Sequence, residues 1–152
     1  IGEVVIKGEN VIDAYEDNPE ANENSFTNGW FRTGDQGIID NNGYLSLTGR
    51  LKELINRSGE KISPREIDEA LMGHPKVAEA VAFAIPSSVH GEEPSAAVVV
   101  NEEVSESELI SFVREKLANF KCPRRIYIVE SIPRTATGKI QRRLVAEELT
   151  SS

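Results

Sequence analysis

The sequence predicts an α+β fold from about residue 51 onward, with a β-hairpin and a short mixed sheet packed by helices. Two segments with helical spacing each follow an N-terminal capping signal, and two apolar runs of strand length, 77–85 and 96–100, lie among them. Glycine-bounded hairpin patterns come before these segments. Residues 1–49 are interpreted as a β-rich strip that belongs to another domain.

The first 62 residues are divided by turn-forming residues. Residues 2–6 are predicted to form a strand, and Asn18-Pro19 marks the start of a short helix, because a polar cap precedes proline. The turn signal at residues 40–43 joins two apolar segments into a hairpin. Residues 49–62 are predicted to form a second hairpin, with Ser58-Gly59 at its tip.

Two capping boxes define the predicted helices. Ser63 is a helix cap, Pro64 takes the first helical position, and Glu66 follows three residues after the cap. Ser105 and Glu108 repeat this spacing before a second helix. The residues that we expect to face the core at helical spacing are Ile67, Ala70, Leu71, Leu109, Phe112, Val113 and Leu117.

The remaining elements are predicted from apolar runs. Residues 77–85 and 96–100 should be strands of one sheet, and residues 125–129 should return as another strand. Residues 140–149 have the composition of a terminal helix.

Composition indicates a soluble, stably folded protein. Hydrophobic residues make up 39% and charged residues 28%, and no apolar run approaches the length of a membrane span. The single cysteine, Cys122, excludes an internal disulfide framework and is compatible with a reducing compartment. Because the chain starts at Ile1 and opens on what reads as the middle of a strand, we expect it to be part of a longer protein.

Charge is unevenly distributed along the chain. The net charge of -8 argues against general binding of nucleic acid or anionic membranes. Residues 114–143 nevertheless carry nine basic residues against two acidic ones: Arg114, Lys116, Lys121, Arg124, Arg125, Arg134, Lys139, Arg142 and Arg143 against Glu115 and Glu130. This basic segment is interpreted either as a solvated face or as the patch that an anionic ligand would use.

Lys139 stands out within the basic segment. It follows Gly138 in the stretch 133–143, and a lone cation held there suits a phosphate or a carboxylate. The stretch is not a P-loop, because Pro133 stands where that motif needs glycine and Ile140 where it needs a hydroxyl residue.

Four motifs in order resemble the late motifs of adenylate-forming enzymes, a superfamily that includes acyl-CoA synthetases, 4-coumarate-CoA ligases, luciferases and the adenylation domains of peptide synthetases. The motifs are Gly29-Trp30-Phe31-Arg32-Thr33-Gly34-Asp35, Gly49-Arg50-Leu51-Lys52-Glu53-Leu54-Ile55, the Gly59 loop before Ile62-Ser63-Pro64-Arg65-Glu66-Ile67, and residues 133–143. The resemblance covers nearly the whole chain. Within the superfamily the chain looks most like 4-coumarate-CoA ligases and the peroxisomal-type synthetases related to oxalyl-CoA synthetase.

The resemblance implies a domain division and a two-step reaction. Residues 1–49 would be the last strip of the large adenylation domain, 50–52 the hinge, and 53–152 the C-terminal lid domain. A small-molecule carboxylate would attack ATP to form an acyl-adenylate, and CoA would then displace AMP. The partners implied are ATP, CoA and the upstream large domain, with no nucleic acid and no membrane span. Mg²⁺ would accompany ATP through ligands outside this chain, and the isolated fragment would be inactive.

By the same resemblance, Lys139 is the catalytic residue that lies between the carboxylate and the α-phosphate. Asp35 would accept hydrogen bonds from the ribose hydroxyls, and Arg50 would lie against the sugar or the phosphate. Lys52 aligns with the hinge residue. The loop of Ser58, Gly59 and Glu60 aligns with the segment that enters beside the pantetheine tunnel.

Other readings stay open for several of these residues. Asp35 could be a turn residue, Lys52 an exposed strand lysine, and Gly59 a plain hairpin glycine. His74, His90 and Cys122 receive no catalytic role, because their spacing does not suit a metal site.

Two other functions are weighed against the CoA ligase. One is an adenylation domain that delivers an amino acid or acyl group to a carrier protein, and the other is a non-catalytic polyanion-binding module. The expected location is the cytoplasm or the peroxisome, without a targeting signal at the end, Thr150-Ser151-Ser152.

Overall fold

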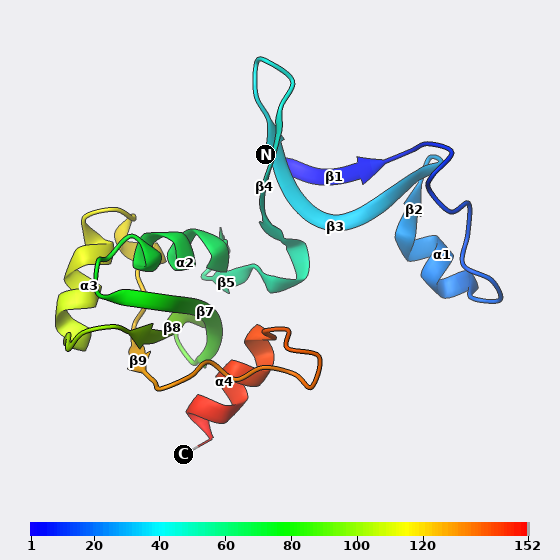
Figure 1. Ribbon diagram of the computed structural model, residues 1–152. Helices are drawn as coiled ribbons and strands as arrows, with labels where there is room; N and C mark the ends of the chain where they lie inside the picture. The colour runs from blue at the N-terminus through cyan, green and yellow to red at the C-terminus, as the bar shows by residue number, and fades with distance from the viewer. Residues whose placement is uncertain (152) are drawn as a thin grey trace. The chain divides into compact units, whose positions relative to one another are not determined.

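The computed structural model describes residues 1–151. The chain divides into two compact units, here called unit 1, Ile1–Lys52, and unit 2, Glu53–Ser152. The two are described separately, with the elements labelled as in Figure 1.

Unit 1 is a four-stranded antiparallel sheet with one short helix. Its elements are β1 (Gly2–Ile6), α1 (Pro19–Ser25), β2 (Phe26–Thr27), β3 (Trp30–Ile39) and β4 (Leu45–Arg50). β3 pairs with β1, β2 and β4, so this long strand organises the sheet. Much of the apolar surface of the unit stays exposed, as at Trp30 (44%), Ile39 (69%) and Tyr44 (73%).

The predicted local signals of unit 1 are confirmed. The Asn18 side chain accepts the N–H of Ala21 at 3.0 Å and caps α1. In the hairpin between β3 and β4, the Asp40 carboxylate accepts the N–H groups of Asn42 (2.8 Å) and Tyr44 (2.9 Å). The Asp40 side chain therefore ties the turn to the start of the next strand.

Unit 2 contains a five-stranded mixed sheet and three α-helices. Its strands are β5 (Ile55–Arg57), β6 (Glu60–Ile62), β7 (Val77–Ser87), β8 (Gly91–Val100) and β9 (Ile126–Ile128). Its helices are α2 (Pro64–Met72), α3 (Glu106–Arg114) and α4 (Arg142–Thr150), with the short 3-10 helices η1 (Leu51–Glu53) at its boundary with unit 1 and η2 (Asn119–Lys121) within it. β8 pairs with β7 along one edge, and with β5 and β9 on the other. β9 runs parallel to β8, whereas the other pairs are antiparallel, so the predicted mixed sheet is confirmed.

The two faces of β7 explain how helices cover both sides of this sheet. Ala80, Ala82 and Ala84 belong to the core beneath α2 and α3, whereas Val81 and Phe83 alternate with them and belong to the core beneath α4. Small side chains on one face allow two helices to approach closely, and larger ones fill the space under the single helix.

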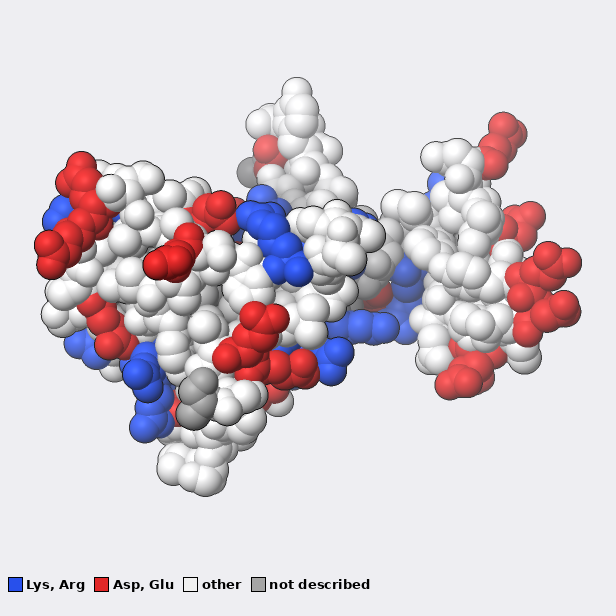
Figure 2. Space-filling view, turned by 60° about the horizontal axis from the view of Figure 1, so that its bottom comes forward, with Lys and Arg blue, Asp and Glu red and all other residues white. Residues whose placement is uncertain are grey.

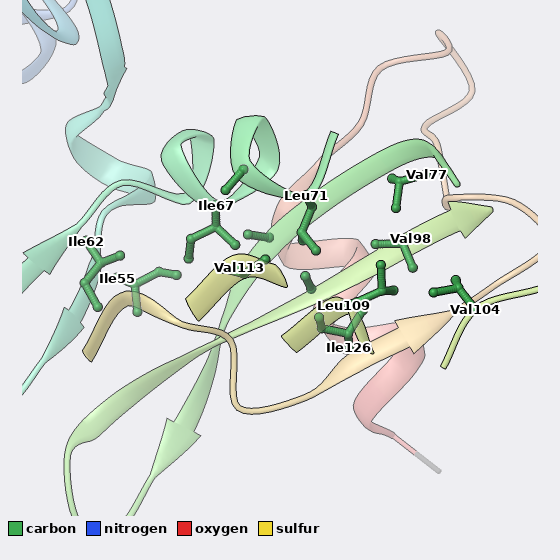
Figure 3. Packing of buried hydrophobic residues seen from close by; sticks show 13 residues of the cluster. Ile55, Ile62, Ile67, Leu71, Val77, Val98, Val104, Leu109, Val113 and Ile126 are labelled. Carbon is green, nitrogen blue, oxygen red and sulfur yellow. The ribbon is translucent and has the colours of Figure 1, made fainter. Parts of the chain in front are cut away.

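The larger core is shown in Figure 3. Ile67 and Leu71 of α2 and Leu109 and Val113 of α3 are fully buried and meet Val98 of the sheet. Burying one such side chain contributes roughly 1.5–3 kcal/mol. These are the helix positions predicted from the 3.6-residue period, apart from Phe112 and Leu117, which are half-buried.

The predicted serine cap forms at α3, whereas at α2 the Ser63 side chain makes no cap hydrogen bond. Ser105 Oγ accepts the N–H of Glu108 at 3.2 Å, as predicted. At α2, the N–H of Glu66 binds the backbone carbonyl of Ser63 at 3.2 Å, and the Glu66 carboxylate binds Lys121 Nζ at 2.8 Å. The Glu66 carboxylate thus takes part in a tertiary ion pair, and α2 begins at Pro64 as predicted.

The predicted hairpin over residues 49–62 is correct only from Ile55 onward. Gly49 and Arg50 lie in β4, where they pair with Gln36 and Asp35, and Leu51–Glu53 form a 3-10 turn. The ladder with β3 takes up these residues because it satisfies their backbone groups, a long-range choice that local sequence does not signal.

Candidate functional site

Lys139 lies at the base of a tight turn between β9 and α4. The N–H of Gly138 binds the Thr135 carbonyl and the N–H of Thr135 binds the Lys139 carbonyl, both at 2.8 Å. Gly138 has a φ of 79°, which is the left-handed residue of a three-residue hairpin loop with a bulge. Glycine is required there by the backbone, and the exposed Lys139 side chain follows it directly.

Ion pairs with other elements of unit 2 hold the chain on both sides of the turn. Before it, Arg134 binds Glu79 of β7 at 2.7 Å and the Gly138 carbonyl at 3.4 Å. After it, Arg142 is the first residue of α4 and binds Asp68 of α2 at 2.7 Å. The ion pairs of Arg134 and Arg142 therefore hold the two ends of the segment that contains Lys139.

The Arg142–Asp68 pair is partly withdrawn from water. Burial raises the pKa of the Asp68 carboxyl, and its hydrogen bond and charge interaction with Arg142 oppose that rise. For Arg142, burial favours the neutral form, but the hydrogen bonds to Asp68 and Glu53 outweigh it and raise the pKa of the guanidinium. The pair is a structural ion pair, and the sequence analysis did not identify it.

Asp35 and Arg50, both predicted to contact nucleotide, lie together in unit 1. They are directly opposite in the β3–β4 ladder, and Arg50 Nε is 3.1 Å from Asp35 Oδ1. Thr33 Oγ1 accepts the N–H of Asp35 at 3.1 Å and donates to the Val4 carbonyl at 2.7 Å, with Gly34 between them at φ 72°. The Asp35 carboxylate is thus held half-buried at one place on the sheet.

Lys52 is exposed and lies in the middle of η1, the 3-10 turn that follows β4. It is not in a strand, so the reading of Lys52 as an exposed strand lysine was wrong. The division between the two compact units falls directly after it, before Glu53.

Ser58 and Gly59 form the β5–β6 turn, as the sequence predicted, and Glu60 is the first residue of β6. Ser58 has a φ of 52° and Gly59 a φ of 91°, the two positive values that a type I′ turn needs. Sequence reasoning missed the neighbour of this turn, His90: Ser58 Oγ lies 2.8 Å from His90 Nδ1, and Ser58 N–H binds the His90 carbonyl at 2.8 Å. In the sequence, His90 is marked only by its position before Gly91. That position does not indicate a contact with Ser58, because the pairing of Gly91 with Arg57 is known only from the sheet.

A buried carboxylate lies behind the Ser58 turn and was also missed. Glu93 binds Arg124 at 2.6 Å, with Arg57 at 3.9 Å and His90 at 4.0 Å. The hydrogen bond from Arg124 lowers the pKa of the Glu93 carboxyl, despite an opposing effect of burial. A pocket of about 240 Å³ adjoins this cluster, and its lining includes Arg57, Arg114 and Arg124. Glu93 also lines this pocket, so three guanidinium groups face one carboxylate there, and the remaining positive charge suits an anion.

More than half of the basic residues in the segment 114–143 pair with acids that lie outside that segment. Five of its nine basic residues contact carboxylates: Lys121 with Glu66, Arg124 with Glu93, Arg134 with Glu79, Arg142 with Glu53 and Asp68, and Arg143 with Glu147. On the face drawn in Figure 2, blue and red side chains are interspersed. This pairing does not favour the polyanion-binding module, because most of the charge is already compensated.

Neither a metal-binding cluster nor a membrane-spanning helix occurs among the described residues. Among residues 1–151, no three His, Cys, Asp or Glu side chains converge on a position that could hold a metal ion. No helix there is long and apolar enough to span a membrane.

The sequence and fold match known enzymes. Residues 66–139 match the family of the AMP-binding enzyme C-terminal domain. The oxalate–CoA ligase of Saccharomyces cerevisiae is 51% identical over 100% of this chain and 29% of its own length. The probable CoA ligase CCL9 of Humulus lupulus is 55% identical over 96% of this chain and 28% of its own length.

Solved structures agree with these relatives. The o-succinylbenzoate CoA synthetase of Bacillus subtilis, in complex with its acyl-adenylate intermediate, has a TM-score of 0.85 and 39% identity, over 93% of this chain and 29% of that one. ATP-bound MatB of Rhodopseudomonas palustris has a TM-score of 0.89 and 32% identity, over 97% of this chain and 30% of that one.

The chain thus spans less than a third of the length of the relatives described above. The match of residues 66–139, the identity to CoA ligases and the shared α+β fold lead to one conclusion. The chain belongs to the family of the AMP-binding enzyme C-terminal domain.

Proposed function

We propose that the protein with this chain is an AMP-forming carboxylate–CoA ligase, in which unit 2 is the lid and unit 1 the last strip of the large domain. A carboxylate oxygen of the substrate attacks the α-phosphorus of ATP, and pyrophosphate leaves. The sulfur of CoA then attacks the acyl carbon, and AMP leaves. The 51% and 55% identities to CoA ligases support this reaction class.

The Lys139 turn is the observation that carries the proposal. The turn presents an exposed ammonium group on a segment anchored by Arg134 and Arg142, and within residues 1–151 no carboxylate contacts that group. Both reactants of the first step are anions, so their approach needs a cation that is not already compensated. Lys139 takes this role by lying between the substrate carboxylate and the α-phosphate.

Unit 1 contributes the nucleotide contact. The Asp35 carboxylate is oriented by Thr33 and faces Arg50 at 3.1 Å, which leaves its second oxygen free of that ion pair to accept from ribose hydroxyls. Carboxylate oxygens accept two such hydrogen bonds readily. The exposed apolar surface of unit 1, including Trp30 and Tyr44, is then surface that the upstream large domain covers.

Lys52 is the hinge between the two steps. Its backbone lies in a single 3-10 turn between two separately packed units, and a change of a few dihedral angles there redirects the whole lid. The exposed ammonium group does not hold the turn in one conformation.

The Ser58 turn and the arginine pocket behind it serve the second step. The turn, Ser58 to Glu60, would lie beside the pantetheine arm, where Gly59 presents no side chain. CoA carries a diphosphate and a further phosphate, and Arg57, Arg114 and Arg124 at the adjoining pocket suit these groups. Mg²⁺ would be held with ATP by groups outside this chain.

A carboxylate panel tests the proposal on the full-length enzyme. AMP release would be measured with ATP, CoA and each acid in turn, beginning with oxalate, then o-succinylbenzoate and long-chain fatty acids. One acid should give AMP and its CoA thioester in equal amounts. If no acid gives a CoA thioester, but a phosphopantetheinylated carrier protein accepts the acyl group and a thioester forms on it, the carrier-dependent adenylation function is identified instead.

The single cysteine is free, which fits a reducing compartment. We place the enzyme in the cytoplasm or the peroxisome, and a fluorescent fusion of the full-length protein would distinguish the two.

A further inference from the structure

We propose that Arg142 is a positioning residue for Lys139: its guanidinium fixes the lysine-bearing segment to the lid and, through Glu53, to the first residue after the hinge. The proposal rests on the proposed function of Lys139 and Lys52. It concerns a side chain that would not touch substrate itself.

One guanidinium group joins three separate elements. Arg142 Nη2 and Nη1 donate to the two oxygens of Asp68 in α2 at 2.7 and 3.2 Å. Nη1 also donates to the Ala82 carbonyl of β7 at 2.8 Å, and Nε donates to Glu53 at 2.9 Å. Asp68 in turn accepts the N–H of Ala82 at 2.5 Å. The planar fork of arginine satisfies all these acceptors at once, which a lysine ammonium cannot do in the same geometry.

Exposure separates this anchor from the other ion pairs near Lys139. The Arg142 and Asp68 side chains are 22% and 17% exposed and Glu53 is 42% exposed, whereas Arg134 and Glu79 are 45% and 46% exposed, so the Asp68 contact is what separates the two anchors. Arg143 and Glu147 are 79% and 52% exposed. Exposed pairs contribute little, about 0–1 kcal/mol, because solvent screens them. The Arg142 cluster is therefore the firm anchor of the segment, and the Arg134 pair is a weaker one.

The spacing limits how far Lys139 can move. Lys139 and Arg142 are three positions apart in the sequence, so their Cα atoms lie at most about 11 Å apart. On the other side, the Thr135 turn closes on Lys139 itself through the 2.8 Å bond between Thr135 N–H and the Lys139 carbonyl. With Arg142 held, the lysine backbone has a restricted range and its side chain starts from a defined place.

The contact with Glu53 links this anchor to the hinge. Glu53 is the last residue of η1 and follows Lys52 directly. Its carboxylate reaches Arg142 across 89 positions of the sequence. The direction in which the lid chain leaves the hinge is thus tied to the segment that carries Lys139, so closure of the lid places both together.

The test uses the full-length enzyme with Arg142→Gln, Arg142→Lys and Glu53→Gln, and Arg143→Gln as the matched control. Two half-reactions are measured: pyrophosphate exchange with ATP for adenylation, and CoA transfer to a supplied acyl-adenylate. Each variant is also followed by thermal unfolding. Lys139→Ala is assayed in parallel.

Arg142→Gln should lower kcat of adenylation roughly 10- to 100-fold, because small misplacement of a catalytic group has effects of that size. The KM for ATP and the rate of CoA transfer should change less than about threefold, since neither depends on where the lysine lies in the first transition state. Arg142→Lys should show a smaller loss of adenylation than Arg142→Gln. Glu53→Gln should slow adenylation several-fold at an unchanged melting temperature. Arg143→Gln should match wild type in both half-reactions.

Two results would overturn the proposal. One is an equal loss of both half-reactions in Arg142→Gln, in step with the melting temperature, because that is the mark of a purely structural role. The other is adenylation within twofold of wild type in both Arg142→Lys and Glu53→Gln, which would decide the matter even if Arg142→Gln does not fold. If Lys139→Ala also keeps full adenylation, the proposed role of Lys139 fails, and if the wild-type enzyme shows no adenylation with any acid, the proposed function fails, so the failures are distinguished.

Discussion

Lys139 differs from the arginines close to it in sequence in that no carboxylate of residues 1–151 contacts its ammonium group. Arg134, Arg142 and Arg143 close to it in sequence are each within 3.0 Å of a carboxylate oxygen. The three paired arginines stabilise the fold, and the ammonium group of Lys139 is available to a ligand. The same sequence motif thus holds residues of two kinds, which only their surroundings separate.

Replacing Lys139 tests its chemical role. In the full-length enzyme, Lys139→Ala should lower the rate of acyl-adenylate formation about 10²- to 10³-fold, as for loss of one electrostatic contact to a transition state. CoA transfer to a supplied acyl-adenylate should stay nearly normal, because the two anions that Lys139 brings together are already joined in that intermediate. Lys116→Ala, which removes only an exposed cation stacked on Phe112, is the control and should match wild type. Equal loss of both steps would contradict the role of Lys139.

Glu93 is a second residue whose surroundings decide its behaviour. Its pKa is lowered by Arg124, so the folded state holds the ionised carboxylate more firmly than the unfolded state does. A lowered pKa contributes stability that is present above the unfolded value, near 4.5, and is lost as pH falls through the folded value.

We therefore expect the free energy of unfolding of the chain to fall as the pH is lowered from about 5 toward 3, in part through Glu93. Glu93→Gln should be less stable at neutral pH and should show a shallower decline with acid, because a neutral amide has no proton to gain. Chemical unfolding at a series of pH values measures this. Parallel curves for the variant and wild type would exclude Glu93 as a source of the acid dependence.

At the scale of elements, the turns of unit 2 can be predicted from local sequence more fully than the packing of its strands. The β5–β6 turn needs left-handed backbone at Ser58 and Gly59, and the sequence signals it locally. β7 is instead an apolar run whose two faces serve different cores, Ala82 toward α2 and α3, and Phe83 toward α4. That division depends on which helices pack there.

Two substitutions at Gly59 separate its backbone role from its place beside CoA. Gly59→Ala and Gly59→Leu should each destabilise the fold by about 1–2 kcal/mol, since both place a Cβ at a φ of 91°. No heavy atom lies within 4 Å of that Cβ, so the larger side chain should add little further strain. Gly59→Leu alone should slow CoA transfer strongly, because it fills space proposed for the pantetheine arm. Equal CoA transfer in the two variants would remove the tunnel role.

At the scale of the whole molecule, the chain is two units joined at one short 3-10 turn. Unit 2 has its own core on both faces of its sheet, whereas unit 1 leaves Ile39 and Tyr44 largely exposed. A separately packed body on a short connector can rotate as a whole. This is the arrangement that a two-step ligase with one mobile lid requires.

Lys52→Pro tests that rotation. Proline restricts φ at position 52 and the conformation of Leu51 before it, so the turn should keep one geometry. In the full-length enzyme, whichever half-reaction needs the other geometry should be slowed, and we expect this to be CoA transfer. Lys52→Ala removes the charge while keeping the backbone free, and it should leave both steps close to normal. Normal thioester formation in the proline variant would contradict the hinge.

The sequence by itself predicted much of this protein. The caps of α1 and α3, the Asp40 turn, the Ser58-Gly59 tip and the buried helix positions Ile67 and Leu109 all follow from contacts within a few residues. The order of four motifs also identified the family. Local geometry and motif order are properties of short stretches, and short stretches can be read directly.

Only the tertiary structure decided the remainder. It moved Gly49 and Arg50 into the ladder with β3, gave the Glu66 carboxylate to Lys121, and brought Arg142 to Asp68 and Glu53. Each of these choices pairs groups far apart in the chain, because a buried donor or charge takes the partner that folding brings near it, whatever its distance in sequence.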